Sequence, residues 1–201
     1  VSGHVNKPGN YELVMGMTWQ DLIFDLCGGI RDGNDLKCWI PGGASAPWFV
    51  PELHLETPVT IDDVGKNGSM LGSGAVIVMD DTTNVVAAAH RIVRFFAHES
   101  CGQCTPCREG TTWLEQVLWR LLNGHGRAMD LDLLLDISDN ISPGLRWPPA
   151  QTTICPLGPS AVSPIRSIMT HFRNEVEAMV TAGAPNDDAA AATDAEGVTV
   201  G

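Results

Sequence analysis

Positively charged side chains are scarce in this chain. Its 201 residues hold 12 Lys and Arg against 24 Asp and Glu, which gives a formal net charge of -12 at pH 7. A surface that tracks a phosphate backbone needs clustered cations, and a strongly acidic chain supplies few of them. The composition therefore excludes nucleic acid as the main partner.

Long apolar runs are absent as well. No uninterrupted apolar stretch approaches the roughly 20 residues that a membrane-spanning helix requires. The N-terminus also lacks the basic and then apolar pattern of a signal peptide. Because hydrophobic residues still make up 44% of the chain and charged residues 18%, we expect one or two compact domains and no direct membrane insertion.

Two common catalytic motifs have no match in the sequence. The six histidines form no H-E-x-x-H pair, so a hydrolytic metal site is not expected. The glycine-rich segments 41–43 and 68–74 do not fit the G-x-G-x-x-G pattern between a strand and a helix. We interpret both segments as ordinary turns rather than phosphate-binding loops.

Cysteine is where the sequence is most informative. Cys101, Cys104 and Cys107 follow one another at C-x-x-C spacing, and Cys155 stands alone before a proline. This set of three plus one is typical of iron-sulfur ligation, in which three closely spaced thiolates bind a 4Fe-4S cluster from one side and a distant fourth completes the ligand set. Structural zinc usually takes its ligands as two C-x-x-C pairs. The spacing therefore favours a cluster and electron transfer, and a zinc-stapled binding module stays open as the alternative of another class.

The two remaining cysteines stand in apolar surroundings. Cys27 follows a helix-like stretch and Cys38 lies in a strand-like one. Buried cysteines in such contexts usually pack without reacting. We expect neither to ligate metal or to form a disulfide.

The first part of the chain, residues 1–81, predicts a small α+β domain. A helix over 18–27 begins with Thr18 and Asp21 as a capping box and ends at two glycines. Predicted strands cover 1–5 and 10–13, paired as a hairpin around the turn 7–9, then 37–40 and 75–79.

The second part, residues 82–180, predicts a four-helix bundle. Its apolar periodicity indicates helices over 85–98, 110–123 and 130–141, and a fourth that begins at Pro164. Cys101 to Cys107 would then lie in the loop between the first two helices, and Cys155 in the loop before the fourth. The last part, residues 181–201, is acidic and alanine-rich and predicts a disordered tail.

These motifs carry a resemblance to a known family. Ser-Cys-Gly-Gln-Cys-Thr-Pro-Cys-Arg-Glu-Gly from position 100 and Thr-Ile-Cys-Pro-Leu-Gly from position 153 resemble the C-terminal half of the NADH-binding flavoprotein subunit of respiratory complex I, NADH:quinone oxidoreductase. Upstream, residues 2–12, 41–43 and 72–78 resemble the β-grasp (ubiquitin-like) SLBB domain of that family. In the family the fourth cysteine is usually followed by Ala-Leu-Gly, whereas Pro156 follows Cys155 here.

The resemblance implies an electron relay. Hydride would pass from NADH to FMN, and a 4Fe-4S cluster on Cys101, Cys104, Cys107 and Cys155 would pass electrons singly to further clusters and to quinone. The FMN and NADH domain of the family is expected before residue 1, so this segment alone should not oxidise NADH. The implied partners are a 2Fe-2S subunit and a multi-cluster subunit of the peripheral arm, on the cytoplasmic side of a bacterial cell membrane.

A second member of the same superfamily fits the same residues. The diaphorase subunit of an NAD-reducing hydrogenase or of an NAD-dependent formate dehydrogenase shares both modules. The absence of further cysteines after Cys155 favours complex I.

Overall fold

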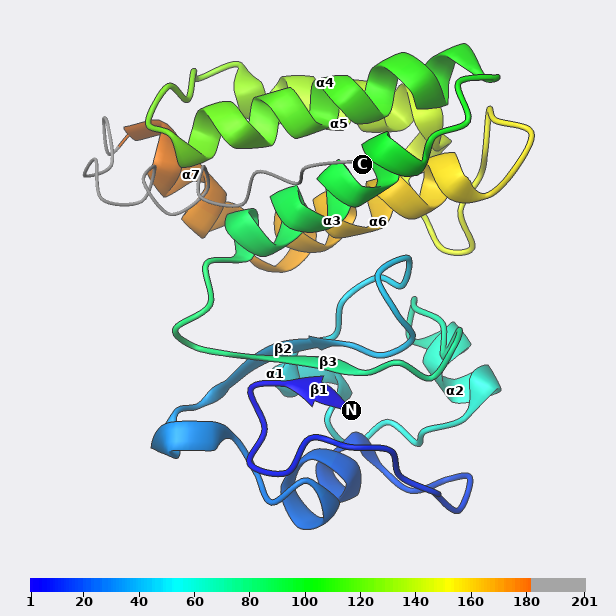
Figure 1. Cartoon of the computed structure of the whole chain (residues 1–201), viewed down its shortest axis with the longest axis vertical. Helices are drawn as coiled ribbons and strands as arrows, with labels where there is room; N and C mark the ends of the chain where they lie inside the picture. The colour runs from blue at the N-terminus through cyan, green and yellow to red at the C-terminus, as the bar shows by residue number, and fades with distance from the viewer. Residues whose placement is uncertain (182–201) are drawn as a thin grey trace, which may run out of the picture.

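The computed structural model describes residues 1–181, so the predicted tail lies, beyond its first residue, outside the described part of the chain. The chain forms two layers, a small sheet with short helices below and a layer of longer helices above (Figure 1). This arrangement confirms the α+β class. Among the described residues, no helix is both long and apolar enough to cross a membrane.

The sheet has three strands in the order β1-β3-β2. β1 (Ser2–Gly3) runs parallel to β3 (Ile77–Asp80), and β2 (Leu36–Ile40) runs antiparallel to it. Successive side chains of a strand point to opposite faces. Cys38 and Ile40 accordingly pack against the helical layer, whereas Trp39 and Val78 enter a separate core within the lower layer. Both faces of the sheet are therefore buried.

The strands predicted over 37–40 and 75–79 are confirmed to within two residues, but the predicted N-terminal hairpin is wrong. Residues 10–13 form no strand. Val1 and Gly9 exchange a pair of main-chain hydrogen bonds, but no strand ladder continues from them. The amides of Ser2 and His4 instead donate to the carbonyls of Val76 and Val78. The N-terminal segment thus pairs with a strand more than 70 residues away in sequence, which turn patterns cannot reveal.

The helix predicted over 18–27 is present and capped as expected. Thr18 and Asp21 exchange hydrogen bonds between main-chain amides and side-chain oxygens, 2.9 and 3.1 Å long. Its last part, η1 (Asp21–Leu26), is wound as a π-helix. The remaining short elements of this layer are η2 (Arg31–Gly33), α1 (Pro51–His54) and α2 (Ile61–Lys66).

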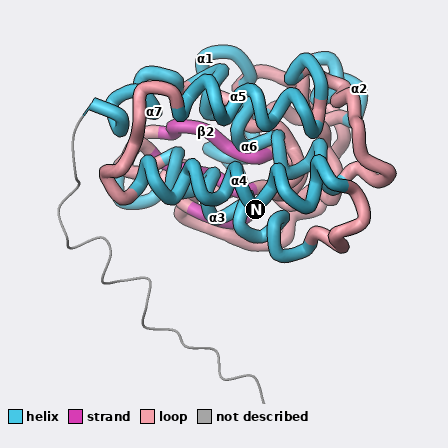
Figure 2. The backbone as a smooth tube through the Cα atoms, turned by 90° about the horizontal axis from the view of Figure 1, so that it is seen from above, coloured by secondary structure: helices cyan, strands magenta, loops and turns pink. Residues whose placement is uncertain are grey.

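The upper layer contains α3 (Val85–Glu99), α4 (Thr105–Leu122), α5 (Asp130–Ile141), the short η3 (Pro143–Leu145), α6 (Leu157–His171) and α7 (Arg173–Thr181). Figure 2 shows these helices stacked over the strands, and in Figure 1 α3 and α6 lie nearer to the sheet than α4 and α5 do. The helices predicted over 85–98 and 130–141 are confirmed.

Two predicted helix starts are wrong. α4 begins at Thr105 rather than 110, because Pro106 fits the first turn, where a helix needs no N–H from it. α6 begins at Leu157, so Pro164 lies inside the helix rather than at its start. The buried face of α6 runs from Gly158 to Met169, and this packing outweighs the one backbone donor that proline removes.

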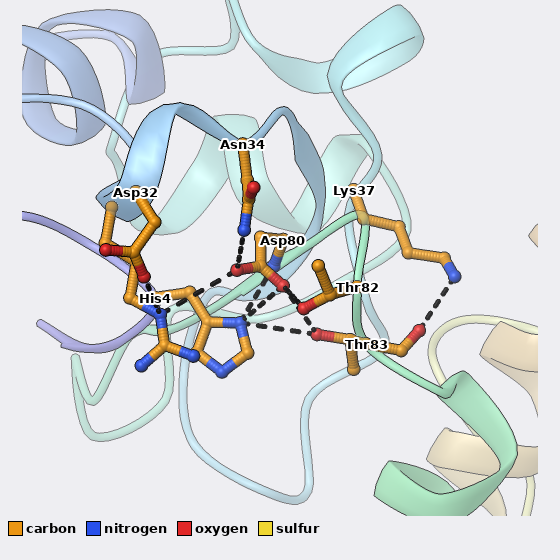
Figure 3. Close-up of polar contacts among 8 residues, drawn as sticks. His4, Asp32, Asn34, Lys37, Asp80, Thr82 and Thr83 are labelled. Atoms are coloured by element: carbon orange, nitrogen blue, oxygen red, sulfur yellow. Dashed lines mark hydrogen bonds and ion pairs between the residues drawn. The ribbon is translucent and has the colours of Figure 1, made fainter.

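The connection from β3 to α3 is fastened around Asp80. Its fully buried carboxylate accepts hydrogen bonds from Asn34 (3.1 Å) and Thr82 (2.6 Å) and lies 2.7 Å from Nδ1 of His4 (Figure 3). Burial raises the pKa of Asp80, but the hydrogen bonds from Thr82, Asn34 and His4 outweigh it and hold that pKa well below the usual range.

Lys37 holds the same connection from its other side. Its ammonium group donates to the carbonyl of Thr83 and to Glu175 of α7, 2.8 Å in each case. The linker is thus tied both to the sheet and to the helical layer.

Candidate metal centre

The four cysteines predicted as ligands meet at one pocket. Cys101, Cys104, Cys107 and Cys155 line a cavity of about 90 Å³ at the ends of α3, α4 and α6. Glu99, Ser100, Thr153 and Leu157 complete its wall. The fold therefore brings together residues more than 50 positions apart in the sequence.

The loop between α3 and α4 presents the first thiols. α3 ends at Glu99 with Ser100 as its C-cap, and Gly102 turns the chain with a φ of +79° that residues with a side chain rarely adopt. Arg108 fixes the turn, since its guanidinium donates to the carbonyl of Gly102 and to the carboxylate of Glu109, both at 2.8 Å. The loop thus holds its shape through bonds within the polypeptide.

The third thiol lies on a helix rather than in the loop, which corrects the prediction. Cys104 is the N-cap of α4, and Cys107 sits in its first turn and is buried. Thr111 donates to the carbonyl of Cys107 (2.7 Å), and the Ser100 hydroxyl lies 3.2 Å from the Cys107 sulfur. The first turn of α4 therefore sets where this sulfur points.

The fourth thiol precedes α6, as predicted. Thr153 donates to the carbonyl of Cys155 (2.8 Å), and the amide of Ile154 donates to the sulfur of Cys104 (3.3 Å). A Cβ on Gly158 would lie 2.9 Å from Thr153, so only glycine lets α6 begin this close to the segment. These contacts lay the 153–155 segment directly against the C-x-x-C run.

Four cysteine side chains dominate the chemistry of this pocket. Among the residues that the structure describes, no group of three or more His, Cys, Asp or Glu side chains is already arranged around a single point. Thiols spread around a pocket match the soft, anionic ligand set of an iron-sulfur cluster.

The sequence analysis did not predict the groups other than cysteines that contact the sulfurs of the expected ligands. Ser100 and Ile154 approach Cys107 and Cys104 through a hydroxyl and a main-chain amide. The only signal in the sequence is that each lies next to a predicted ligand. A serine or a backbone group carries no recognisable motif for this role.

A wider cavity of about 530 Å³ adjoins the same site. Both glycine-rich segments, Phe95 and Phe96 of α3, and Cys155 line it. The two segments pack backbone against backbone, because a Cβ on Gly42 or Gly72 would lie 2.3 Å from a carbonyl oxygen of the other segment. The glycines thus serve close packing, and neither segment forms the helix start that a phosphate loop requires.

Cys27 and Cys38 lie away from the pocket, each fully buried in an apolar core. Burial raises the pKa of Cys38 to about 12 and also raises that of Cys27. Thiols of this kind carry little thiolate at neutral pH and do not react readily.

Two protein-family models match the chain. Residues 87–179 match the family described as the NADH-ubiquinone oxidoreductase-F iron-sulfur binding region, and residues 1–78 match the SLBB domain. The first region takes in all four pocket cysteines.

Curated relatives agree with these matches. The NADH-quinone oxidoreductase F subunit of Mycobacterium bovis is 47% identical over 91% of this chain, and that of Streptomyces coelicolor is 48% identical over 94%. The chain spans about 40% of the length of these relatives, in their C-terminal part.

A solved structure resembles the fold. The NAD+-reducing [NiFe]-hydrogenase in its H2-reduced state superposes with a TM-score of 0.73 at 30% identity, covering 92% of this chain and 29% of that one. With matches to the SLBB domain and to the NADH-ubiquinone oxidoreductase-F iron-sulfur binding region, the chain is similar over 91 to 94% of its length to the C-terminal part of NADH-quinone oxidoreductase F subunits.

Proposed function

We propose that Cys101, Cys104, Cys107 and Cys155 hold a 4Fe-4S cluster and that the chain transfers electrons through it. The observation that carries the proposal is the single pocket that these four thiols line. When bound, the cluster supplies one-electron redox chemistry. The family to which residues 87–179 belong is defined by iron-sulfur binding, which supports the assignment.

The polypeptide would orient the ligand sulfurs and adjust the reduction potential. Hydrogen bonds to ligand sulfurs stabilise added negative charge, so the Ile154 amide at Cys104 and the Ser100 hydroxyl at Cys107 would raise the reduction potential. Cys107 is buried, whereas Cys101 and Cys155 are exposed. Cys107 would therefore hold the group from the protein interior, and Cys101 and Cys155 would hold it from the exposed rim.

Within the parent enzyme, the proposed reaction is NADH:quinone oxidoreduction. NADH would reduce FMN on an N-terminal domain, and this segment would relay the electrons to a 2Fe-2S subunit and a multi-cluster subunit. The complex would lie at the cytoplasmic face of a bacterial cell membrane. We expect the 201-residue chain by itself to oxidise no NADH.

A second candidate is the diaphorase part of an NAD-reducing hydrogenase, favoured by the TM-score of 0.73 to such an enzyme. Sequence identity supports the quinone enzyme, since its curated relatives reach 47 to 48% against 30% for the hydrogenase. The three-plus-one spacing of the cysteines disfavours the zinc-stapled module, because structural zinc usually takes its ligands as two C-x-x-C pairs.

The deciding experiment is iron, zinc and sulfide analysis of the chain purified without oxygen, with electron paramagnetic resonance before and after dithionite. We expect about four irons and four sulfides per chain for a 4Fe-4S cluster, and a signal that appears on reduction. Stoichiometric zinc in a colourless protein would refute electron transfer.

Replacing Cys104 by Ala tests the ligand set. We expect the variant to lose the 4Fe-4S signal, because Cys104, the N-cap of α4, lines the pocket and its sulfur accepts a hydrogen bond from the Ile154 amide. Cys38→Ser is the matched control, since that cysteine is buried in the core away from the pocket, and it should keep full iron content. A full cluster in the first variant, or iron loss in the second, would contradict the assignment.

A further inference from the structure

Arg166 of α6 is an unusual cation in this molecule. Of the 12 Lys and Arg residues, only Lys37, Arg120 and Arg166 are not exposed. Lys37 pairs with Glu175 at 2.8 Å, and Arg120 pairs with the buried Asp130. Arg166 makes no hydrogen bond or ion pair with any residue of the described part of the chain. Within the described residues, Arg166 is therefore the one partly buried Lys or Arg side chain without a counter-charge.

The guanidinium lies at the seam between the two layers. A Cβ on Gly68, in the turn that follows α2, would lie 3.6 Å from Nη2 of Arg166, so the side chain reaches from the helical layer to the lower one. Desolvation by burial lowers the pKa of Arg166. The charge is thus partly stripped of water, and no carboxylate of the described residues pairs with it.

Two histidines extend this seam. His171, at the end of α6, meets His54 of α1 with ring centroids 6.0 Å apart, and His54 stacks on Phe49 at 4.1 Å. Burial lowers the pKa of both histidines. His54 and the charge of Arg166 lower the pKa of His171 further, whereas Glu52 raises it. His171 interacts electrostatically with Arg166, and a neutral imidazole there can donate an N–H to a bound anion.

A partly desolvated charge costs free energy unless an opposite charge joins it. A guanidinium offers a planar fork of donors that matches a carboxylate or a phosphate in a bidentate manner. We propose that Arg166 anchors an oxyanion site at the seam between α6 and the turn after α2, which takes a carboxylate or phosphate group. This proposal is independent of the cysteine pocket.

The first test measures thermal unfolding of the chain with increasing inorganic phosphate, at ionic strength held constant with chloride. We expect phosphate to raise the Tm of the wild type. In Arg166→Met the unpaired charge is gone while the apolar stem remains, so the Tm without phosphate should rise and the increment from phosphate should vanish. Arg166→Lys keeps the charge without the fork and should bind phosphate at least tenfold more weakly.

Arg94→Met is the matched control, because Arg94 is an exposed arginine of α3 without an ion pair in the described residues. It should keep the full phosphate increment. Iron and sulfide content should be unchanged in all three variants, which separates failure of this site from failure of the cluster assignment.

A second measurement identifies the source of the anion. Phenylglyoxal modifies accessible arginines, and its reaction with Arg166 can be followed by mass spectrometry in the chain and in the assembled parent enzyme. Protection only in the assembled enzyme would show that a partner carboxylate fills the site, and protection by phosphate in the chain would show a free anion. Equal modification under all conditions, with the same phosphate increment in wild type and Arg166→Met, would overturn the proposal.

Discussion

Single residues decide how closely the backbone segments around the cysteine pocket approach one another. Gly42 is the clearest case, because a Cβ there would lie 2.3 Å from the Met70 carbonyl oxygen and 2.5 Å from the Leu71 carbonyl carbon. Both neighbours are main-chain atoms, which cannot move aside as a side-chain end can. The sequence showed a glycine-rich turn here, but the need for glycine arises from a second segment about 30 residues away.

Replacing Gly42 by Ala should therefore destabilise the chain by about 1–3 kcal/mol, the usual cost of overpacking. Gly65→Ala provides the control, because Gly65 lies in α2 and a Cβ there meets nothing within 4 Å. That change should be neutral or stabilise by up to about 1 kcal/mol, since alanine favours a helix. Urea unfolding of both variants measures the difference, and equal stabilities would contradict the packing argument.

The ligand cysteines could be predicted from the sequence because iron-sulfur chemistry fixes both the residue type and the spacing. The groups that contact their sulfurs could not. Ser100 and Ile154 reach the sulfurs only because α3 ends and the 153–155 segment passes at the right places. Contacts of this kind depend on tertiary structure and leave no pattern in the chain.

At the scale of elements, local signals predicted helices better than strand partners. The capping box at Thr18 and Asp21 and the periodicity over 85–98 needed only neighbouring residues, and both are confirmed. The hairpin failed because β1 pairs with β3, far along the chain. Proline was ambiguous in the same way, since Pro106 begins a helix and Pro164 lies inside one.

The linker between β3 and α3 yields a prediction on pH. The pKa of Asp80 is depressed in the folded state, so its contribution to stability is complete above the unfolded pKa of about 3.9 and declines as the pH falls below that value. Asp80→Asn should lower the free energy of unfolding at neutral pH by about 1–3 kcal/mol, because it leaves buried donors poorly matched.

Chemical denaturation of both proteins between about pH 3 and pH 7 checks this expectation. As the pH falls below the unfolded pKa of aspartate, the free energy of unfolding should decrease less in Asp80→Asn than in the wild type. The difference in stability between the two proteins should therefore shrink. Curves that stay parallel down to the lowest pH would show that the Asp80 carboxylate does not supply the linkage.

At the scale of the whole molecule, one of the two buried cores is shared by both layers, and the other lies within the lower layer. Residues of the lower layer, including Ile40, Trp48 and Met79, belong to the same buried cluster as the inner faces of α3, α4, α5 and α6. The main-chain amide of Trp48 also donates to Ser167 of α6 at 2.9 Å. The separation into domains at residue 81 stays a prediction. Composition and periodicity reveal the change from strands to helices, but they do not reveal how the two parts pack against each other.

This shared core predicts joint unfolding. We expect far-UV circular dichroism, which reports the helices, and tryptophan fluorescence, to which the buried Trp19 and Trp39 of the lower layer contribute, to change in one coincident transition. Trp48→Ala should lower the free energy of unfolding by about 3–5 kcal/mol, and by the same amount whether it is measured by circular dichroism or by fluorescence. Trp119→Ala, at a site 51% exposed, should have little effect, and two separated transitions in the wild type would show that the layers fold independently.

The unequal exposure of the four thiols also bears on how the protein is made. Cys107 is buried in a helix turn that intramolecular hydrogen bonds already hold, whereas Cys101 and Cys155 lie at the rim. Iron and sulfide delivered to the folded chain would meet the rim thiols first and the deepest thiol last. Loading would then proceed from the surface inward, without the polypeptide having to wrap around a finished cluster.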